Sequence, residues 1–163
     1  MKEILLTQGQ VALVDDEDYD KLNMHKWYAH WIPNTRSFRA QRNSSSKNGE
    51  SKIIRMHRIV MDAQPGQQVD HRNHNTLDNR RENLRLCTAS ENQHNLRPHT
   101  IRSSVFKGVN WDKPTHKWKA RIQLNGHQYH LGRFADETKA ACAYDSAARK
   151  LFGEFAHLNF QNI

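Results

Sequence analysis

The chain has 163 residues, a hydrophobic content of 36% and a mean hydropathy of −0.95. This length allows one domain or two small ones, and so polar a composition favours two or three modest cores over a single large one. No apolar run is long enough to cross a membrane, and Met1-Lys2-Glu3 does not begin a signal peptide, so we expect an intracellular protein.

The charge is strongly positive and unevenly distributed. The formal charge is +8 at neutral pH, and the pI is about 9.7. Residues 1–20 hold one basic and six acidic side chains, whereas residues 21–163 hold 24 basic and 11 acidic ones. This charge favours a polyanionic partner bound in a salt-dependent way, although a merely soluble basic protein would look the same.

The two cysteines, Cys87 and Cys142, stand in apolar runs without partners at metal-ligand spacing. This pattern argues against a disulfide scaffold and against a structural zinc site built on cysteine. We expect free thiols in a reducing cytoplasm.

The N-terminal region predicts a hairpin followed by a helix. Residues 3–14 indicate two short strands with a turn at Gln8-Gly9, and Asp15–Asp18 indicate the start of a short helix. Four acids could also bind a metal, but negative charge at a helix N-terminus explains them without one.

A second hairpin is predicted from residues 27–31 and 37–42, with its turn at Pro33-Asn34. Its arginines alternate loosely with apolar residues, so they could line a DNA backbone or form the solvated face of a sheet. These arginines are Arg36, Arg39 and Arg42.

Residues 43–51 form a low-complexity loop, residues 53–54 resume a strand, and residues 56–61 predict a short helix or turn. Within the last segment, the guanidinium of Arg58 suits contact with a phosphate, and we predict a DNA-binding or structural role for it. His57 is interpreted as a structural histidine or a DNA contact rather than a catalytic group.

Residues 69–92 hold the most informative pattern of the chain. Asp70 and His71 stand side by side at the end of one predicted strand, and a polar loop separates them from a second apolar run at residues 84–87. Most of the asparagines and the histidine of the loop, residues 73–79, are explained as turn residues. His74 could also be a second base, but the spacing does not select it.

A helix is predicted to follow this second strand. Thr88 and Glu91 have the spacing of a capping box, which puts Asn92 on the first helical turn. The order strand, loop, strand, helix would bring an acid, a base and an amide together.

This pattern resembles the HNH motif of small phage and intron-encoded endonucleases. The resemblance implies a ββα-metal fold and metal-assisted hydrolysis of phosphodiesters in DNA. The matching residues are Asp70, His71, Asn83, Leu84, Glu91 and Asn92.

The resemblance also assigns roles to these residues. His71 would be the general base, Asp70 and Asn92 would hold a divalent cation, and Asn83 would orient the loop and His71. Because an amide stands where the family often has histidine, we expect Mg²⁺ or Mn²⁺ and no structural zinc.

The last sixty residues predict a second small domain. Pro98 ends any helix begun at Thr88, and strands at residues 104–111, 117–122 and 129–134 precede a helix capped by Asp136. Gly153 ends this helix, and its expected apolar stripe consists of Ala140, Ala143, Tyr144, Ala147 and Leu151.

This unit resembles the Apetala-two-type DNA-binding domain of plant transcription factors, in the residues Gly108-Val109, Trp118, Leu131-Gly132, Phe134, Ala143-Tyr144-Asp145, Ala147-Ala148, Phe152-Gly153 and Leu158-Asn159-Phe160. The resemblance implies a sheet that lies in the major groove. The contacts carried over by position are Lys107, Asn110, Trp111, Trp118, Lys119, Arg121 and His130. The plant domains have arginine where this chain has Lys107 and Asn110, and tryptophan where it has His130, so the DNA sequences that the plant domains recognise do not transfer to this chain. One of the two tryptophans, Trp111 or Trp118, is expected to belong to the core.

Together these patterns predict an α+β protein. Residues 1–96 would form an HNH nuclease domain, with a β-rich part at 1–56 and the ββα-metal motif at 69–95; residues 97–103 would be a linker, and residues 104–163 a DNA-binding domain of three antiparallel strands and a helix. We expect a phage-encoded, homing-like, site-specific or nicking endonuclease that acts on double-stranded DNA in the bacterial cytoplasm, with no membrane partner.

Two alternatives remain open. One is a DNA-binding regulator with an inactive HNH unit. The other is an RNA-binding or structural phage protein, although the chain lacks the aromatic stacking platforms of single-strand RNA binders.

Overall fold

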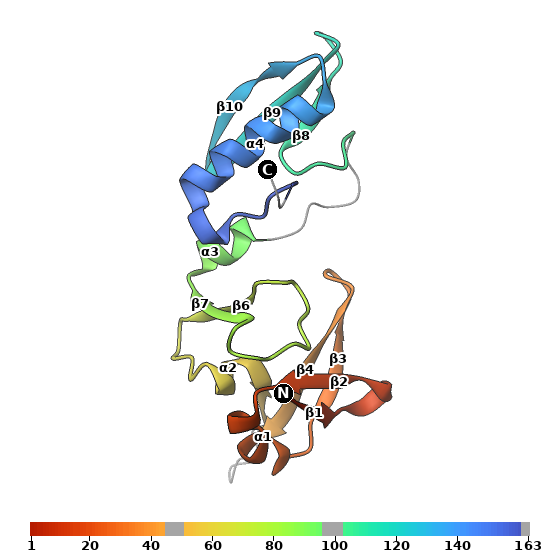
Figure 1. Cartoon of the computed structure of the whole chain (residues 1–163), viewed down its shortest axis with the longest axis vertical. Coiled ribbons are helices and arrows are strands. Elements are labelled where there is room, and N and C mark those ends of the chain that lie inside the picture. Colours follow the sequence, from red (N-terminus) through yellow and green to blue (C-terminus); the bar gives the residue numbers. More distant parts are fainter. Residues whose placement is uncertain (45–50, 96–102, 161–163) are drawn as a thin grey trace. The chain divides into compact units, whose positions relative to one another are not determined.

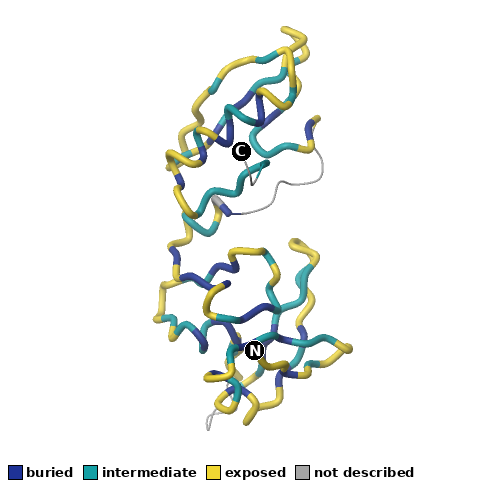
Figure 2. Tube along the Cα trace, viewed as in Figure 1, coloured by how far each residue is buried: buried dark blue, intermediate teal, exposed yellow. Residues whose placement is uncertain are grey.

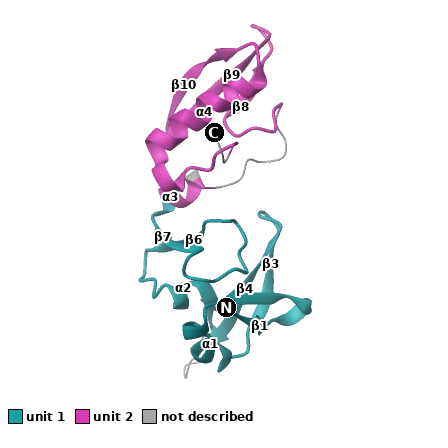
Figure 3. Ribbon diagram, viewed as in Figure 1, with its two compact units in different colours: residues 1–89 teal, residues 90–163 magenta. Residues whose placement is uncertain are grey.

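The protein is a mixed α/β chain with several small antiparallel sheets (Figure 1). The computed structural model describes residues 1–44, 51–95 and 103–160. Most of the predicted loop at 43–51 and nearly all of the predicted linker at 97–103 lie outside these residues. The chain divides into two compact units, residues 1–89 and residues 90–163 (Figure 3). In the part of the chain that is described, no helix is both long and apolar enough to cross a membrane.

The first unit begins with the predicted hairpin. Strand β1 (Lys2–Leu5) pairs antiparallel with β2 (Val11–Val14). The connection contains a 3₁₀ turn, η1 (Thr7–Gly9), in which Gln8 and Gly9 both have positive φ, 59° and 66°. The Gln8-Gly9 dipeptide therefore makes the turn, as predicted.

Helix α1 (Asp16–Asn23) begins at the acidic cluster, with three acids in its first turn. The guanidinium of Arg81 donates to both carboxylate oxygens of Asp18, at 2.8 and 2.9 Å, and the Arg81 amide donates to Asp15 at 2.8 Å. The cluster thus starts a helix and fastens a distant segment to it. Among the described residues, no three His, Cys, Asp or Glu side chains group closely enough to hold a metal ion.

A three-stranded antiparallel sheet follows, in the order β3 (Tyr28–Ile32), β4 (Ser37–Ser44), β5 (Lys52–Arg55). Helix α2 (Met56–Val60) follows β5 directly and packs against β4 and β5. Residues 33–36 turn the chain between β3 and β4, where the sequence predicts the turn.

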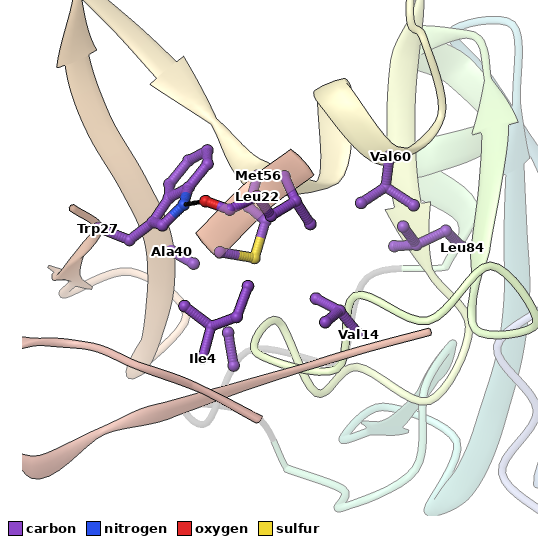
Figure 4. Close-up of a cluster of buried hydrophobic side chains, with 9 residues drawn as sticks. Ile4, Val14, Leu22, Trp27, Ala40, Met56, Val60 and Leu84 are labelled. Carbon is purple, nitrogen blue, oxygen red and sulfur yellow. Dashed lines mark hydrogen bonds between the residues drawn. The ribbon is translucent and has the colours of Figure 1, made fainter. Parts of the chain in front are cut away.

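One hydrophobic core holds these elements together (Figure 4). The indole N–H of Trp27 donates to the carbonyl of Leu22 at 2.8 Å, so its polar atom is satisfied inside the core. Full burial of a side chain such as Leu22 or Met56 contributes about 2 kcal/mol. The buried members of this cluster are Ile4, Ala12, Val14, Leu22, Trp27, Ala40, Met56, Val60 and Leu84.

The last sheet of the first unit pairs β6 (Gln68–His71) with β7 (Leu84–Cys87) in antiparallel register. The loop between them, residues 72–83, is tied to β2, because Leu13 donates to the carbonyl of Leu77 at 2.9 Å and accepts from Asn79 at 2.8 Å. The N-terminal hairpin therefore supports the loop that follows Asp70 and His71.

Helix α3 (Ala89–His94) begins where the first unit ends. In the second unit, β8 (Val109–Asp112), β9 (Lys117–Leu124) and β10 (His127–Phe134) form an antiparallel sheet in the order β10-β9-β8. The predicted Asn125-Gly126 hairpin turn is present, with both residues at positive φ. Three strands and a helix thus occur in the predicted order.

Helix α4 (Glu137–Phe152) begins at the predicted cap, where Asp136 accepts from the Lys139 amide at 2.8 Å, and a short 3₁₀ turn, η2 (Gly153–Phe155), follows it. The predicted stripe is partly wrong, because Leu151 is 43% exposed and Phe152 is buried instead. The buried row follows steps of four residues along one face, and residues 143, 147 and 151 lie at its flank. In Figure 2, buried and exposed segments alternate along the trace of α4. The buried apolar residues of α4 are Ala140, Ala141, Tyr144, Ala148 and Phe152.

Gly108 is required where the sheet approaches α4. Its φ is 77°, and a Cβ atom there would lie 2.0 Å from a ring carbon of Tyr144 and 2.7 Å from the carbonyl of Arg121. Only glycine allows this approach.

The end of the described chain is fastened to the same unit by a buried acid. Asp145 accepts from the amides of Asn159 and Phe160, each at 2.9 Å. The Asn159 side chain accepts from the Lys107 amide at 2.6 Å, which links the chain end to the segment before β8.

Candidate functional site

The carboxylate of Asp70 is buried in an ion pair. It is 7% exposed, and its Oδ2 accepts from Nε and Nη2 of Arg85 at 2.8 and 2.6 Å. The two residues face each other across β6 and β7, so strand register brings them together. Because both charges are desolvated, removing one would take a strong ionic partner from a charge that stays buried.

His71, the next residue, is also buried, at 6% exposure. Its ring lies edge-on to that of His57, with centroids 5.2 Å apart and planes at 82°. Burial, with a smaller contribution from the charge of Arg39, lowers the pKa of His71 from 6.5 to about 4, although Asn79 and two aspartates act in the opposite direction. The imidazole is therefore neutral at pH 7 and able to accept a proton.

His57 supports this ring from helix α2. Burial, followed by the positive groups around it, lowers the pKa of His57 from 6.5 to about 2. Its Nδ1 is buried without a hydrogen-bond partner among the described residues. The neutral ring of His57 packs edge-on against the ring of His71. Of the two roles predicted for His57, this contact fits the structural one.

Asn83 closes the loop that follows His71. Its side-chain oxygen accepts from the Asn73 amide at 3.0 Å, its amide group donates to the carbonyl of Asp78 at 2.8 Å, and its carbonyl accepts from Arg72 at 2.9 Å. The bonds to Asn73 and Arg72 join the two ends of the loop next to His71, and the bond to Asp78 ties Asn83 to its middle.

A buried acid stiffens the same loop. The carboxylate of Asp78 accepts from two guanidinium nitrogens of Arg80, both at 2.8 Å, and from the Asn73 side chain at 3.0 Å. Arg80 in particular lowers the pKa of Asp78. The Thr76 hydroxyl donates to the carbonyl of Phe38, so the loop is also attached to β4.

In the second unit, strand register separates the predicted DNA contacts into two groups. Asn110 lies opposite Lys119, and Arg121 lies opposite His130. These four residues alternate along the strands with the buried Val109, Ala120 and Ile122, which pack with residues of α4. Because successive side chains of a strand point to opposite faces, the four residues lie on the face of the sheet that α4 does not cover.

The two tryptophans belong to the other face. Trp111 lies opposite Trp118, with ring centroids 5.0 Å apart, and Trp118 packs against the cluster that includes Ala140. Trp118 is the tryptophan expected in the core, and Trp111 is partly exposed beside it. Lys107 precedes β8, where its main chain is held by Asn159.

Comparison with known proteins decides what the first of these sites is. A family model for the HNH endonucleases matches residues 56–94, which span α2, β6, β7 and α3. The chain carries an HNH endonuclease domain. Asp70, His71, Asn83 and Asn92 all fall inside it.

Two viral proteins share sequence with this chain. An uncharacterized HNH endonuclease, L560, of Acanthamoeba polyphaga mimivirus is 38% identical over 91 residues, which cover 56% of this chain and 46% of that protein. Protein 3.8 of Escherichia phage T7 is 30% identical over 91 residues, which cover 56% of this chain and 74% of that protein. The chain therefore belongs to the same family as Protein 3.8.

The same chain is similar to plant transcription factors. Dehydration-responsive element-binding protein 2D of Arabidopsis thaliana is 48% identical over 59 residues, 35% of this chain and 28% of the plant protein. The chain thus spans less than half of the mimivirus protein and little more than a quarter of this plant protein. No solved structure matches the chain.

The HNH domain spans the boundary between the two units. Asp70, His71 and Asn83 lie together in the first unit, whereas Asn92 lies on α3 in the second, with its side chain partly exposed. The structure therefore brings together the first three predicted residues, and the pairing of Asn92 with Asp70 stays a prediction.

Arg58 of the HNH domain is used inside the protein. Its guanidinium donates to the carbonyls of Ala63, Gln64 and Gln67, at 3.0, 3.0 and 2.6 Å, and so organises the turn after α2. Of the two roles predicted for Arg58, these contacts support the structural one.

Sequence reasoning missed Arg85 in the HNH domain and Arg133 on the open face of the second unit. Arg133 lies opposite Lys119 and pairs with Asp112 at 2.7 Å. Finding either arginine would have required the strand register, because Arg85 is not close in sequence to Asp70, nor Arg133 to Asp112.

Proposed function

We propose that the chain is a metal-dependent DNA endonuclease whose hydrolytic centre is Asp70 and His71. The observation that carries the proposal is the buried Asp70-His71 pair on β6, with a neutral imidazole, inside the residues that match the HNH endonucleases. A buried titratable group with a strongly shifted pKa is a frequent sign of a catalytic centre.

In the proposed reaction His71 takes a proton from the attacking water. A neutral imidazole can do so at pH 7, and the edge-on ring of His57 together with the closed loop limits how far His71 can turn. Asn83 is a positioning residue in this scheme, because its bonds are made to the loop and not to His71.

Asp70 and Asn92 would hold the divalent cation. A carboxylate and an amide oxygen suit Mg²⁺ or Mn²⁺, which keep several waters and bind substrate phosphate. When bound, the cation would neutralise the scissile phosphate and stabilise the departing 3′ oxygen. Arg85 would orient the Asp70 carboxylate from the opposite strand.

Residues 104–163 would bind double-stranded DNA as an Apetala-two-type domain after a linker at 97–103, with the nuclease domain at 1–96. The similarity to plant transcription factors and the basic open face of β8, β9 and β10 support this assignment. We also propose that the enzyme is phage-encoded and homing-like and acts in the bacterial cytoplasm. The relationship to Protein 3.8, a phage protein, supports the phage origin.

The alternative function is a DNA-binding regulator with an inactive HNH domain. The similarity to transcription factors favours it. The presence of Asp70, His71, Asn83 and Asn92, the complete set expected of an active centre, favours the nuclease.

Supercoiled plasmid incubated with Mg²⁺ or Mn²⁺ separates these functions. We expect conversion to nicked or linear DNA by the wild type, and its loss in Asp70→Asn, in His71→Ala and with EDTA. His74→Asn is the matched control, because His74 lies in the adjacent loop at a φ of 62°, a conformation that asparagine tolerates.

Two outcomes would contradict the nuclease. Wild-type protein that shifts DNA in a gel but cuts neither plasmid nor the DNA that encodes it, with either metal, would support the regulator. Cleavage that persists in His71→Ala would move the catalytic centre elsewhere.

A further inference from the structure

A polar surface lies on the side of the β3–β4–β5 sheet that faces away from the core. Ala40 points into the core, so its neighbours Arg39 and Gln41 point to the other side. Strand register adds His30 opposite Arg39 and Arg55 opposite Gln41. We call Arg39, Gln41, His30 and Arg55 the polar sheet face.

Among the residues that the structure describes, no acid balances the charge that Arg39 carries on this face. Its Nε is buried and has no hydrogen-bond partner, and its guanidinium makes no ion pair among the described residues. Burial, followed by the charge of Arg55, lowers the pKa of Arg39. A half-buried cation beside another cation is costly, so an anion bound here would relieve a penalty already present.

The same arginine lies beside the hydrolytic centre. Helix α2 packs against β4 and β5, and its His57 lies edge-on to His71 at 5.2 Å. The loop after His71 is itself attached to β4 through Thr76 and the carbonyl of Phe38, next to Arg39. The charge of Arg39 lowers the pKa of both His57 and His71, which agrees with this placement.

We propose that Arg39, with Arg55 next to it, binds a phosphate of the DNA backbone and so holds the strand to be cut against His71. The proposal rests on the nuclease function and adds to it a substrate contact outside the residues that match the HNH family, 56–94. A guanidinium suits this role, because its planar fork matches two phosphate oxygens and keeps its charge when partly buried.

Phosphate is the occupant that the observations favour. On the described part of this face, the side chains opposite Arg39 and Gln41 in the strand register are His30 and Arg55, both bases, so the face repels cations and attracts anions. If the chain is a nuclease, the anion that binds beside His71 is a phosphodiester of its DNA substrate. The first unit would then bind the DNA strand that it cuts through Arg39 and Arg55, in addition to the DNA contacts proposed for the second unit.

The test compares two arginines on opposite faces of one strand, in the full-length protein. Arg39→Gln and Arg39→Lys alter the proposed contact. Arg42→Gln is the matched control, because Arg42 is also on β4, has a buried Nε without a partner, and lies over the Trp27 ring on the core side, 5.6 Å from its centroid. Melting curves establish that each variant is folded.

Two readouts separate binding from cleavage. Affinity for a labelled random-sequence duplex is measured over a range of salt concentrations with each substitution combined with His71→Ala. Single-turnover nicking of supercoiled plasmid is measured with His71 intact.

We expect Arg39→Gln to reduce the slope of log affinity against log salt by about 0.9, the value for one lost phosphate contact, and the nicking rate by at least about tenfold. Arg39→Lys should keep the slope but recover only part of the rate, since a point charge holds a phosphate without fixing its orientation. Arg42→Gln should leave the slope unchanged.

An unchanged slope in folded Arg39→Gln, or an equal fall in Arg42→Gln, would overturn the proposal. If Arg39→Gln does not fold, Arg39→Lys decides: a rate reduced several-fold at an unchanged slope supports the contact, and an unchanged rate overturns it. If the wild type cuts nothing, the nuclease function fails, but the salt slopes still show whether Arg39 binds phosphate.

Discussion

The HNH domain and the sheet of the second unit both depend on charged side chains, but they use them in opposite ways. In the HNH domain the pair Asp70–Arg85 is buried, and the loop after His71 is closed by buried polar groups. On the open face of the second unit, Arg133 pairs with Asp112 while half of its side chain stays exposed. The charged groups of the HNH domain are buried and fixed by ionic contacts, whereas Arg133 on the open face of the second unit is exposed to solvent.

This difference matches the two tasks that we propose. Hydrolysis needs a base and metal ligands in fixed positions and out of bulk water, which a buried network provides. Binding to a DNA backbone needs cations at the surface, where they can replace counterions. Substitutions in the two regions should therefore differ in kind, the first affecting stability and cleavage and the second affecting affinity.

The largest effect is expected from the buried pair. Arg85→Met removes two charge-assisted hydrogen bonds from the buried Asp70 carboxylate, so we expect a loss of about 3–5 kcal/mol in the free energy of unfolding, measured by urea denaturation. Arg133→Met, the matched change in the exposed pair, should leave stability almost unchanged. Equal losses in the two variants would show that the contrast in burial is wrong.

Two turn glycines of the second unit give the next effect. Gly108→Ala places a Cβ atom against Tyr144 at a φ of 77°, so we expect a loss of about 3 kcal/mol in thermal or urea denaturation. Gly126→Ala has a similar φ, 79°, but meets no atom within 4 Å, so backbone strain alone should cost about 1 kcal/mol. The order of the two losses is the test, and the reverse order would contradict the close packing of α4 on the sheet.

Acid should weaken the first unit through His57. The unfolded chain protonates this residue below its ordinary pKa of 6.5, whereas burial keeps the folded residue neutral down to about 2. Burial of neutral His57 therefore has no effect on the free energy of unfolding well above pH 6.5. Below that pH the free energy of unfolding falls, by about 2 kcal/mol between pH 7 and pH 5. Urea denaturation at both pH values should show more than this loss in the wild type, because the lowered pKa of His71 acts in the same direction, and a smaller loss in His57→Gln. Equal losses in the two proteins would mean that His57 is not buried as described.

The smallest effect on stability, but a clear one on binding, is expected at the open face. Lys119→Gln and Arg121→Gln should each lower the salt slope of duplex binding by about 0.9 and leave the melting temperature unchanged. Lys150→Gln, at an exposed position on α4, is the control and should bind as the wild type does. If all three variants behave alike, the open face is not the DNA-binding surface.

Local features of this protein could be predicted from its sequence. The turn at Gln8-Gly9, the helix start at Asp15–Asp18, the hairpin at Asn125-Gly126 and the Asp136 cap all depend on a few adjacent residues, and all are present. The order of β6, loop, β7 and α3 could be predicted for the same reason.

Features that depend on tertiary pairing could not be predicted. Arg85 meets Asp70 because of the register of two strands separated by a twelve-residue loop, and the sequence does not specify that register. His57 meets His71 only after α2 has packed onto the sheet. The exposure of Leu151 and the inward position of Trp118 depend in the same way on how α4 lies on the sheet.

The central claim is that one region cuts DNA and the other binds it. The most direct measurement compares His71→Ala with the double variant Lys119→Gln/Arg121→Gln, in plasmid nicking with Mg²⁺ and in duplex binding under the same conditions. We predict that His71→Ala binds as tightly as the wild type and does not nick, and that the double variant binds weakly and still nicks when enough protein is added. Nicking by His71→Ala at the wild-type rate would contradict the account.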